Sequence, residues 1–205
     1  FISCFGNKQG FLDTLSLGTI TTEELAALVK NKKDIRIDKY TNVMEDEDRE
    51  LNENEIINEN CNCKTIEFIT ITDPTIADYK GMKGKRVKLT AYDGKIVEYE
   101  IDIDGADNVS KVLESTYAEH PDIKFIADRT MRLKKYIDKN TVLQVWVNDL
   151  IEDNMFVTVS YTLNAEASRF WLYPNYDNQI NEQVERISIE KDEDGKPTVK
   201  LHYKE

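Results

Sequence analysis

Two neighbouring runs of β-forming residues, 142–147 and 155–163, constrain the fold of this chain more than any other feature. In the second run Val157, Val159 and Tyr161 alternate with Thr and Ser. Because successive side chains of a strand point to opposite faces, this run predicts one largely apolar face and one mixed or wet face. The first run is apolar at both alternations, as in a strand that is covered on two sides. A polar break separates the runs, which together predict two central antiparallel strands.

The length and composition of the chain are those of a globular protein. Its 205 residues allow one domain with its own core or two small ones, and 40% of them are hydrophobic. No internal repeat or linker demands a division. We therefore expect a tether over residues 1–20 and a single α+β domain over residues 21–205. That domain should be a mainly antiparallel β-sheet with two or three short helices packed against it.

Three short segments carry helix signals. Residues 21–24, Thr-Thr-Glu-Glu, match a capping box and predict a helix that ends near residue 31. A second helix should start at a cap formed by Asp107 or Asn108, and Pro121 should end it. A third helix, short and basic, is expected over residues 131–137.

The clearest hairpin in the sequence is built around Gly94. A three-residue loop with Gly94 in the left-handed conformation sets Val87 opposite Tyr99 and pairs opposite charges on the other face. A two-residue loop would set Leu89 opposite Glu98, an apolar side chain against a charged one. The longer loop is therefore favoured.

The charge balance excludes one class of partner. The chain has a net charge of −12 and a sequence pI of about 4.8, whereas binding to phosphate backbones needs a basic surface. We therefore expect no nucleic acid partner. A protein with a basic surface would be attracted, and the same charge would also keep the chain soluble.

The first four residues read Phe-Ile-Ser-Cys. An apolar pair and a small residue before a cysteine resemble the end of a bacterial lipoprotein signal, the lipobox, although Phe1 stands where Leu is usual. The resemblance implies a lipid on Cys4 and a location in the bacterial cell envelope, periplasmic or surface-exposed. No apolar run approaches the ~20 residues of a membrane-spanning helix, so we expect a membrane contact through the lipid anchor only. The alternative is a cysteine without a lipid.

The other two cysteines, Cys61 and Cys63, are separated by one residue. Acylation of Cys4 would leave them as an even pair, which allows a disulfide, but two separate thiols or a redox role stay open. His120 and His202 are the only histidines. We therefore expect no metal site and no cofactor.

An aromatic-dense segment supplies the candidate binding residues. Alternation places Arg169, Trp171 and Tyr173 on one strand face, while the intervening Phe and Leu would face the core. Trp and Tyr offer a large contact area with a polar group, so this face and Tyr176 are predicted to bind a protein or a small ligand. The alternative is an edge strand that buries Phe170 and Leu172 in the core.

No catalytic motif was found. The chain has no P-loop, no dinucleotide-binding glycine pattern and no G-x-S-x-G or H-E-x-x-H motif, and its carboxylates are too numerous to select a catalytic pair. The leading hypothesis is a noncatalytic bacterial envelope lipoprotein that binds a basic protein or a small ligand, for example an acidic immunity or inhibitor protein. The alternatives are a carboxylate-based hydrolase with a sheet-lined cleft and a structural surface-assembly subunit.

Overall fold

A computed structural model describes residues 9–43, 55–57, 63–127, 131–148, 155–163 and 180–204. The helices in these residues are η1 Leu12–Thr14, α1 Thr22–Leu28, η2 Lys32–Asp34 and α2 Ala106–Glu119. The strands are β1 Ile35–Val43, β2 Glu55–Ile57, β3 Thr65–Ile71, β4 Asp78–Tyr79, β5 Met82–Lys83, β6 Val87–Tyr92, β7 Lys95–Asp104, β8 Lys124–Ala127, β9 Met131–Tyr136, β10 Thr141–Asn148, β11 Phe156–Leu163, β12 Val184–Lys191 and β13 Pro197–Tyr203.

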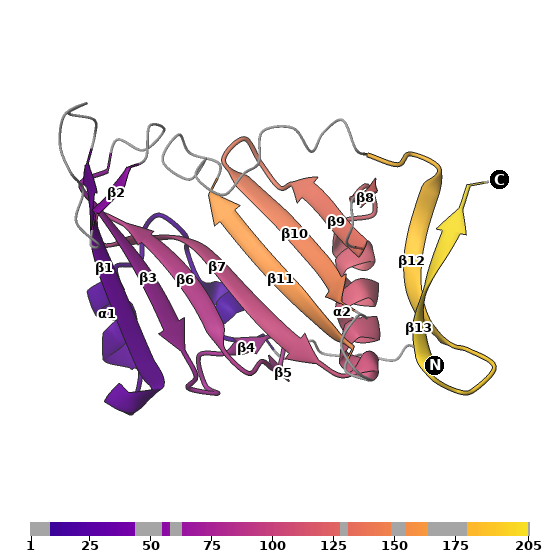
Figure 1. The fold of residues 1–205 in the computed structure, drawn as a ribbon, viewed down its shortest axis with the longest axis horizontal. Coiled ribbons are helices and arrows are strands. Elements are labelled where there is room, and N and C mark those ends of the chain that lie inside the picture. The colour runs from indigo at the N-terminus through magenta and orange to yellow at the C-terminus, as the bar shows by residue number, and fades with distance from the viewer. Residues whose placement is uncertain are drawn as a thin grey trace.

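Nine of these strands form one sheet in the order β2-β1-β3-β6-β7-β11-β10-β9-β8. The β1–β2 pair is parallel, and every other neighbouring pair is antiparallel. The expected pair of central strands is confirmed, since β10 and β11 lie side by side within the sheet (Figure 1). The β12–β13 hairpin stands apart from the sheet, beyond α2.

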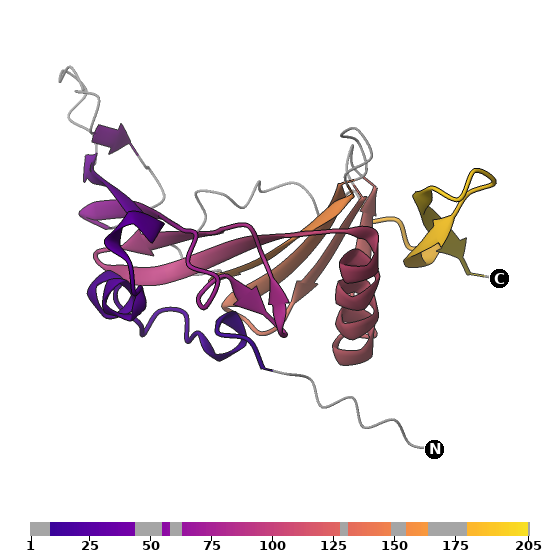
Figure 2. The ribbon, with the colours of Figure 1, turned by 90° about the horizontal axis from the view of Figure 1, so that it is seen from below.

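Both α-helices cover the same face of the nine-stranded sheet, which we call the helix-side face (Figure 2). The apolar stripe expected on α2, with Val109, Val112 and Leu113, packs there against strand residues such as Ile101 and Val159. The helix-side face therefore holds the main hydrophobic core.

The opposite face of the sheet carries polar side chains, and several of them are buried. Thr158, Ser160 and Thr162 of β11 point away from the helices, yet Ser160 is only 1% exposed. Gln144 of β10 is buried beside them. The alternation predicted from the sequence is present, and at these positions the mixed face is buried rather than wet.

The predicted register of the β6–β7 hairpin is wrong. The turn has two residues, Asp93 and Gly94, both with positive φ, and a bulge follows it. The bulge shifts the pairing by one residue, so Leu89 lies opposite Tyr99 rather than Glu98. Positive φ at both turn residues matches the strand twist, which explains why the tight turn is preferred to the longer loop.

The short basic helix predicted over residues 131–137 is a strand, β9. Leu133 is buried on the helix-side face, and the neighbouring basic residues point away from it. Pairing of β9 with both β8 and β10 outweighs the local helix preference of its basic residues.

Both α-helices were predicted from their caps. The capping box is confirmed, because the Thr21 hydroxyl accepts from the Glu24 amide and Glu24 accepts from the Thr21 amide. The second cap differs: α2 begins at Ala106 without a side-chain cap, and Asn108 instead donates to the Asp104 carbonyl oxygen at 2.9 Å.

The segment expected as a tether is described from Gln9 onward, and residues 9–20 pack against the sheet. Leu12 is 1% exposed and belongs to the core. A side chain at Gly10 would collide with Asp78, because an added Cβ would lie 2.3 Å from its carboxylate. The folded part of the chain therefore begins before Thr21.

Candidate functional site

A cleft of about 620 Å³ opens where residues 9–17 approach the C-terminal end of α2. Its remaining lining comes from the β4–β5 turn and from β7, β10 and β11. Clefts of 300–1,000 Å³ commonly hold small ligands. We therefore treat this cleft as the candidate functional site.

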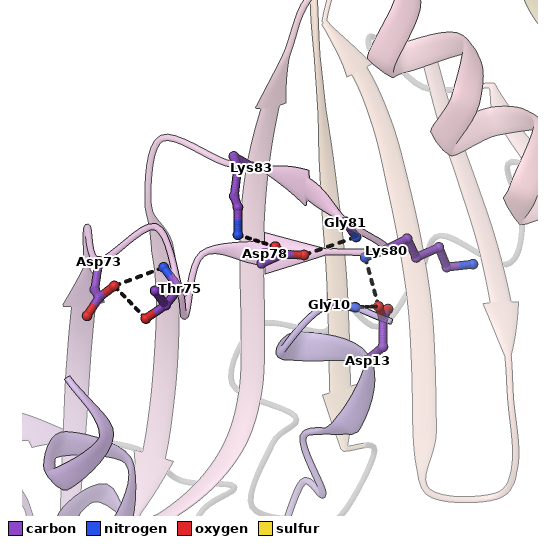
Figure 3. Close-up of polar contacts among 8 residues, drawn as sticks. All are labelled: Gly10, Asp13, Asp73, Thr75, Asp78, Lys80, Gly81 and Lys83. Carbon is purple, nitrogen blue, oxygen red and sulfur yellow. Dashed lines mark hydrogen bonds and ion pairs between the residues drawn. The ribbon is translucent and has the colours of Figure 1, made fainter. Parts of the chain in front are cut away.

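Asp13 of η1 holds one wall of the cleft together. Its Oδ2 atom accepts hydrogen bonds from the amides of Gly10 at 2.6 Å and Lys80 at 2.8 Å (Figure 3). The carboxylate thus joins the N-terminal segment to the β4–β5 turn, which lies far away in the sequence.

The β4–β5 turn brings Lys80 to the cleft. Lys80 and Gly81 both have positive φ, the conformation of a tight two-residue hairpin turn. Asp78 closes this turn, since its Oδ1 atom accepts from the Gly81 amide at 3.0 Å and its other oxygen pairs with Lys83 (Figure 3).

Lys80 spans the cleft toward α2. Its side chain points away from Asp13 in Figure 3, pairs with Glu119 and lies 5.4 Å from the ring centre of Tyr79. The Lys80 side chain is only 11% exposed. An ion pair between a turn and a helix end thus borders the site.

Three tyrosines lie at or near the cleft: Tyr99 and Tyr161 line it, and Tyr79 is buried beside it. Tyr99 and Tyr161 are opposite each other on β7 and β11, with ring centres 5.3 Å apart. The buried Tyr79 lies near Tyr161. Burial raises the pKa of all three phenols, so they are neutral hydrogen-bonding groups at physiological pH.

Leucines form the apolar part of the cleft. Leu15 and Leu17 come from the N-terminal segment, and Leu163 comes from the end of β11. Gly18 allows this approach, because an added Cβ would lie 2.9 Å from the Leu163 side chain. The cleft therefore combines an aliphatic part with a charged part.

A third carboxylate in Figure 3, that of Asp73, holds the end of α1 near the sheet. Asp73 accepts from the amide and hydroxyl of Thr75 at 2.8 and 2.7 Å and from the amide of Lys30 at 3.3 Å. The hydrogen bonds from Thr75 lower the pKa of Asp73. This carboxylate has a structural role outside the cleft.

The predicted binding residues Arg169, Trp171, Tyr173 and Tyr176 lie outside the described residues, as do Cys4 and Cys61. Their assignment stays a prediction. Cys63 is buried and disulfide-bonded. Since its partner is not among the described residues, the pairing of Cys61 with Cys63 also stays a prediction.

The two histidines lie outside the cleft lining. His120 follows the end of α2, where burial lowers its pKa. His202 Nε2 lies 2.7 Å from Ser188 Oγ, and Glu190 lies 3.7 Å from the same ring nitrogen. A Ser-His-acid triad needs the acid on the other nitrogen. The cluster on the β12–β13 hairpin therefore lacks triad geometry.

In the described part of the chain, no three His, Cys, Asp or Glu residues are grouped so that they could hold a metal ion. No helix in this part of the chain has the length and apolar character needed to cross a membrane. Comparisons of the chain with protein-family models, with curated proteins and with solved structures found no match.

The sequence analysis did not anticipate this cleft. Asp13 was assigned to the expected tether, and Lys80 lies in a turn without apolar periodicity. Tyr99 and Tyr161 lie on the apolar alternation of their strands, but only the sheet order makes β7 and β11 neighbours.

Proposed function

We propose that this chain is a noncatalytic α+β binding protein that is held in the bacterial cell envelope by a lipid on Cys4 and takes its ligand in the cleft beside Asp13. The ligand is a small molecule or part of a protein with a basic surface.

The observation that carries this proposal is that the charged groups of the cleft already have partners. Asp13 accepts two backbone amides, and Glu119 is paired with Lys80. A hydrolase needs a carboxylate poised to transfer a proton or to attack. Carboxylates that fix the walls favour binding instead, and the cleft volume of about 620 Å³ suits a small ligand.

The disulfide at Cys63 supports the proposed location. Disulfides persist in oxidising compartments such as the periplasm and the cell surface, and they are rare in the reducing cytosol. The lipobox-like residues 1–4 provide independent support.

Ligand binding is tested by adding a library of small organic fragments to the ¹⁵N-labelled chain and following the amide signals. We expect shifts at the cleft that are lost in Leu17→Ser. Leu28→Ser is the matched control, because Leu28 lies on α1 outside the cleft lining and is 49% exposed. Fragment shifts that survive Leu17→Ser would contradict the assignment of the site.

Lipid attachment is tested by expressing the full-length precursor in bacteria that are fed labelled palmitate. We expect label in the wild-type protein and in Cys63→Ser, and none in Cys4→Ala. Mass spectrometry of unreduced peptides gives a second readout. A disulfide between Cys4 and Cys63 would exclude the lipid, whereas a disulfide between Cys61 and Cys63 is compatible with it.

A further inference from the structure

The charge of the cleft favours a basic group on the ligand. Asp13 and Glu119 bring two carboxylates to the lining, and Lys80 brings one ammonium group. The excess negative charge has the same sign as the net charge of the whole chain, −12. Complementary charge speeds association and selects among ligands.

The aliphatic part of the cleft favours a branched apolar group beside that basic group. Leu15, Leu17 and Leu163 line the cleft together with Tyr161. Burial of apolar surface here contributes binding energy in proportion to the area removed from water.

Backbone amides in the cleft wall can donate hydrogen bonds to a ligand. Leu15 is extended, with φ −71° and ψ 118°, and the Ser16 carbonyl accepts from the amides of Thr19 and Ile20. The amides of Ser16 and Leu17, in contrast, donate to no acceptor within the described residues. An extended peptide carries alternating carbonyl and amide groups that can pair with such a segment.

Tyr161 adds a side-chain group for the same purpose. Tyr161 lines the cleft, and its phenol hydroxyl can donate one hydrogen bond. An acceptor in the ligand, such as a peptide carbonyl oxygen, can take this hydrogen bond.

We propose that the ligand of this cleft is an extended peptide segment in which an aliphatic side chain is adjacent to a basic one. This inference rests on the proposed binding function and names its ligand class. The aliphatic side chain lies among the three leucines, the basic side chain lies toward Glu119 and Asp13, and the peptide backbone pairs with residues 15–17.

The test titrates the full chain with three peptides and follows amide signals by NMR. The probes are acetyl-Gly-Leu-Lys-Gly-amide, its Glu counterpart acetyl-Gly-Leu-Glu-Gly-amide, and acetyl-Gly-Gly-Lys-Gly-amide, which lacks the aliphatic group. We expect the Leu-Lys peptide to bind about tenfold more tightly than either of the other two. Shifts should fall on residues that line the cleft.

Two variants of α2 distinguish an effect of the cleft carboxylate from an effect of the net charge of the whole chain. Glu119→Gln should reduce the preference for the Lys peptide over the Glu peptide by about threefold, because it removes one of the two cleft carboxylates. Glu114→Gln makes the same charge change at an exposed position of α2 outside the cleft. It should leave the preference unchanged.

Failure of this inference can be told apart from failure of the proposed function. Equal affinity for the Lys and Glu peptides, or a preference that Glu119→Gln does not change, overturns the peptide proposal. Organic fragments that bind in the cleft when all three peptides fail also overturn the peptide class and leave the cleft as a ligand site. If neither fragments nor peptides bind, both proposals fall.

Discussion

The two faces of the nine-stranded sheet are built by the same strands but bury different chemistry. On the helix-side face, residues such as Ile101 and Val159 are fully buried among other apolar side chains. On the opposite face, Thr162, Ser160 and Glu98 form a polar row. The Thr162 hydroxyl donates to Glu98 Oε1 at 3.0 Å, and Thr90 donates to the other carboxylate oxygen at 3.1 Å.

This difference shows that the alternation of polar and apolar residues identifies the two faces of a strand but does not predict whether the polar face contacts water. Apolar side chains gain by burial whatever their exact partners, because the hydrophobic effect is not directional. Buried polar groups need partners at hydrogen-bonding distance, since an unpaired group loses its hydration without compensation. The helix-side face should therefore be most sensitive to the loss of apolar volume, and the opposite face should be most sensitive to the loss of hydrogen bonds.

The largest effect is expected at the centre of the helix-side face. Ile101→Ala should lower the free energy of unfolding by about 3 kcal/mol, because it leaves a cavity in a fully buried site. Urea unfolding followed by circular dichroism measures this change. A loss below about 1 kcal/mol would mean that the core at this position is loosely packed.

The next effect concerns the polar row. Thr162→Val keeps the shape of the side chain but removes the donor to Glu98, so it should cost about 2 kcal/mol at neutral pH, the scale of a hydrogen bond to a charged group. The cost should shrink in acid, where Glu98 is protonated. Urea unfolding at two pH values measures both, and an equal cost at the two values would contradict the charged partner.

Glu98 itself allows a pH test. Burial is the main cause that raises its pKa above the usual value of 4.5. The folded state then holds this proton to a higher pH than the unfolded state does. The free energy of unfolding should therefore fall as pH rises through that interval, by about 1.4 kcal/mol for each pH unit between the two pKa values.

Glu98→Gln removes this titration. At pH 7 the variant should be more stable than the wild type, and the gain should vanish below pH 4. Glu114→Gln is the control, because it removes one carboxylate at an exposed position of α2. Stability profiles against pH measure the difference, and parallel profiles for wild type and Glu98→Gln would refute a raised pKa.

Much of the sheet was predictable because its signals are local. The pairing of β10 with β11 follows from alternation and a polar break, and the start of α1 follows from its capping box. The register of β6 and β7 was not predictable in this way. The tight turn at Gly94 alone would oppose Leu89 and Glu98, and only the bulge, which leaves no clear local signal, restores the apolar pairing.

The cleft was less predictable than the fold because its residues meet only through tertiary structure. Asp13 and Lys80 are joined by a hydrogen bond to a backbone amide, and any exposed Asp could make such a bond. Lys80 and Glu119 are 39 positions apart. The aromatic segment around Trp171 carried the stronger local signal, and its role stays a prediction.

The smallest change in the free energy of unfolding is expected at Ser160. It gives the most direct comparison of the two faces, because the neighbouring Val159 lies on the other face of the same strand. Ser160 Oγ lies 3.5 Å from Thr162 Oγ1, which is a weak hydrogen bond at best, so Ser160→Ala should change the free energy of unfolding by less than about 0.5 kcal/mol. Val159→Ala, one residue away and equally buried, should cost about 2 kcal/mol. Urea unfolding of the two variants side by side gives the comparison. Equal costs would mean that Ser160 is bound more firmly than its distance indicates, and that the polar row stabilises the sheet as strongly as the apolar core does.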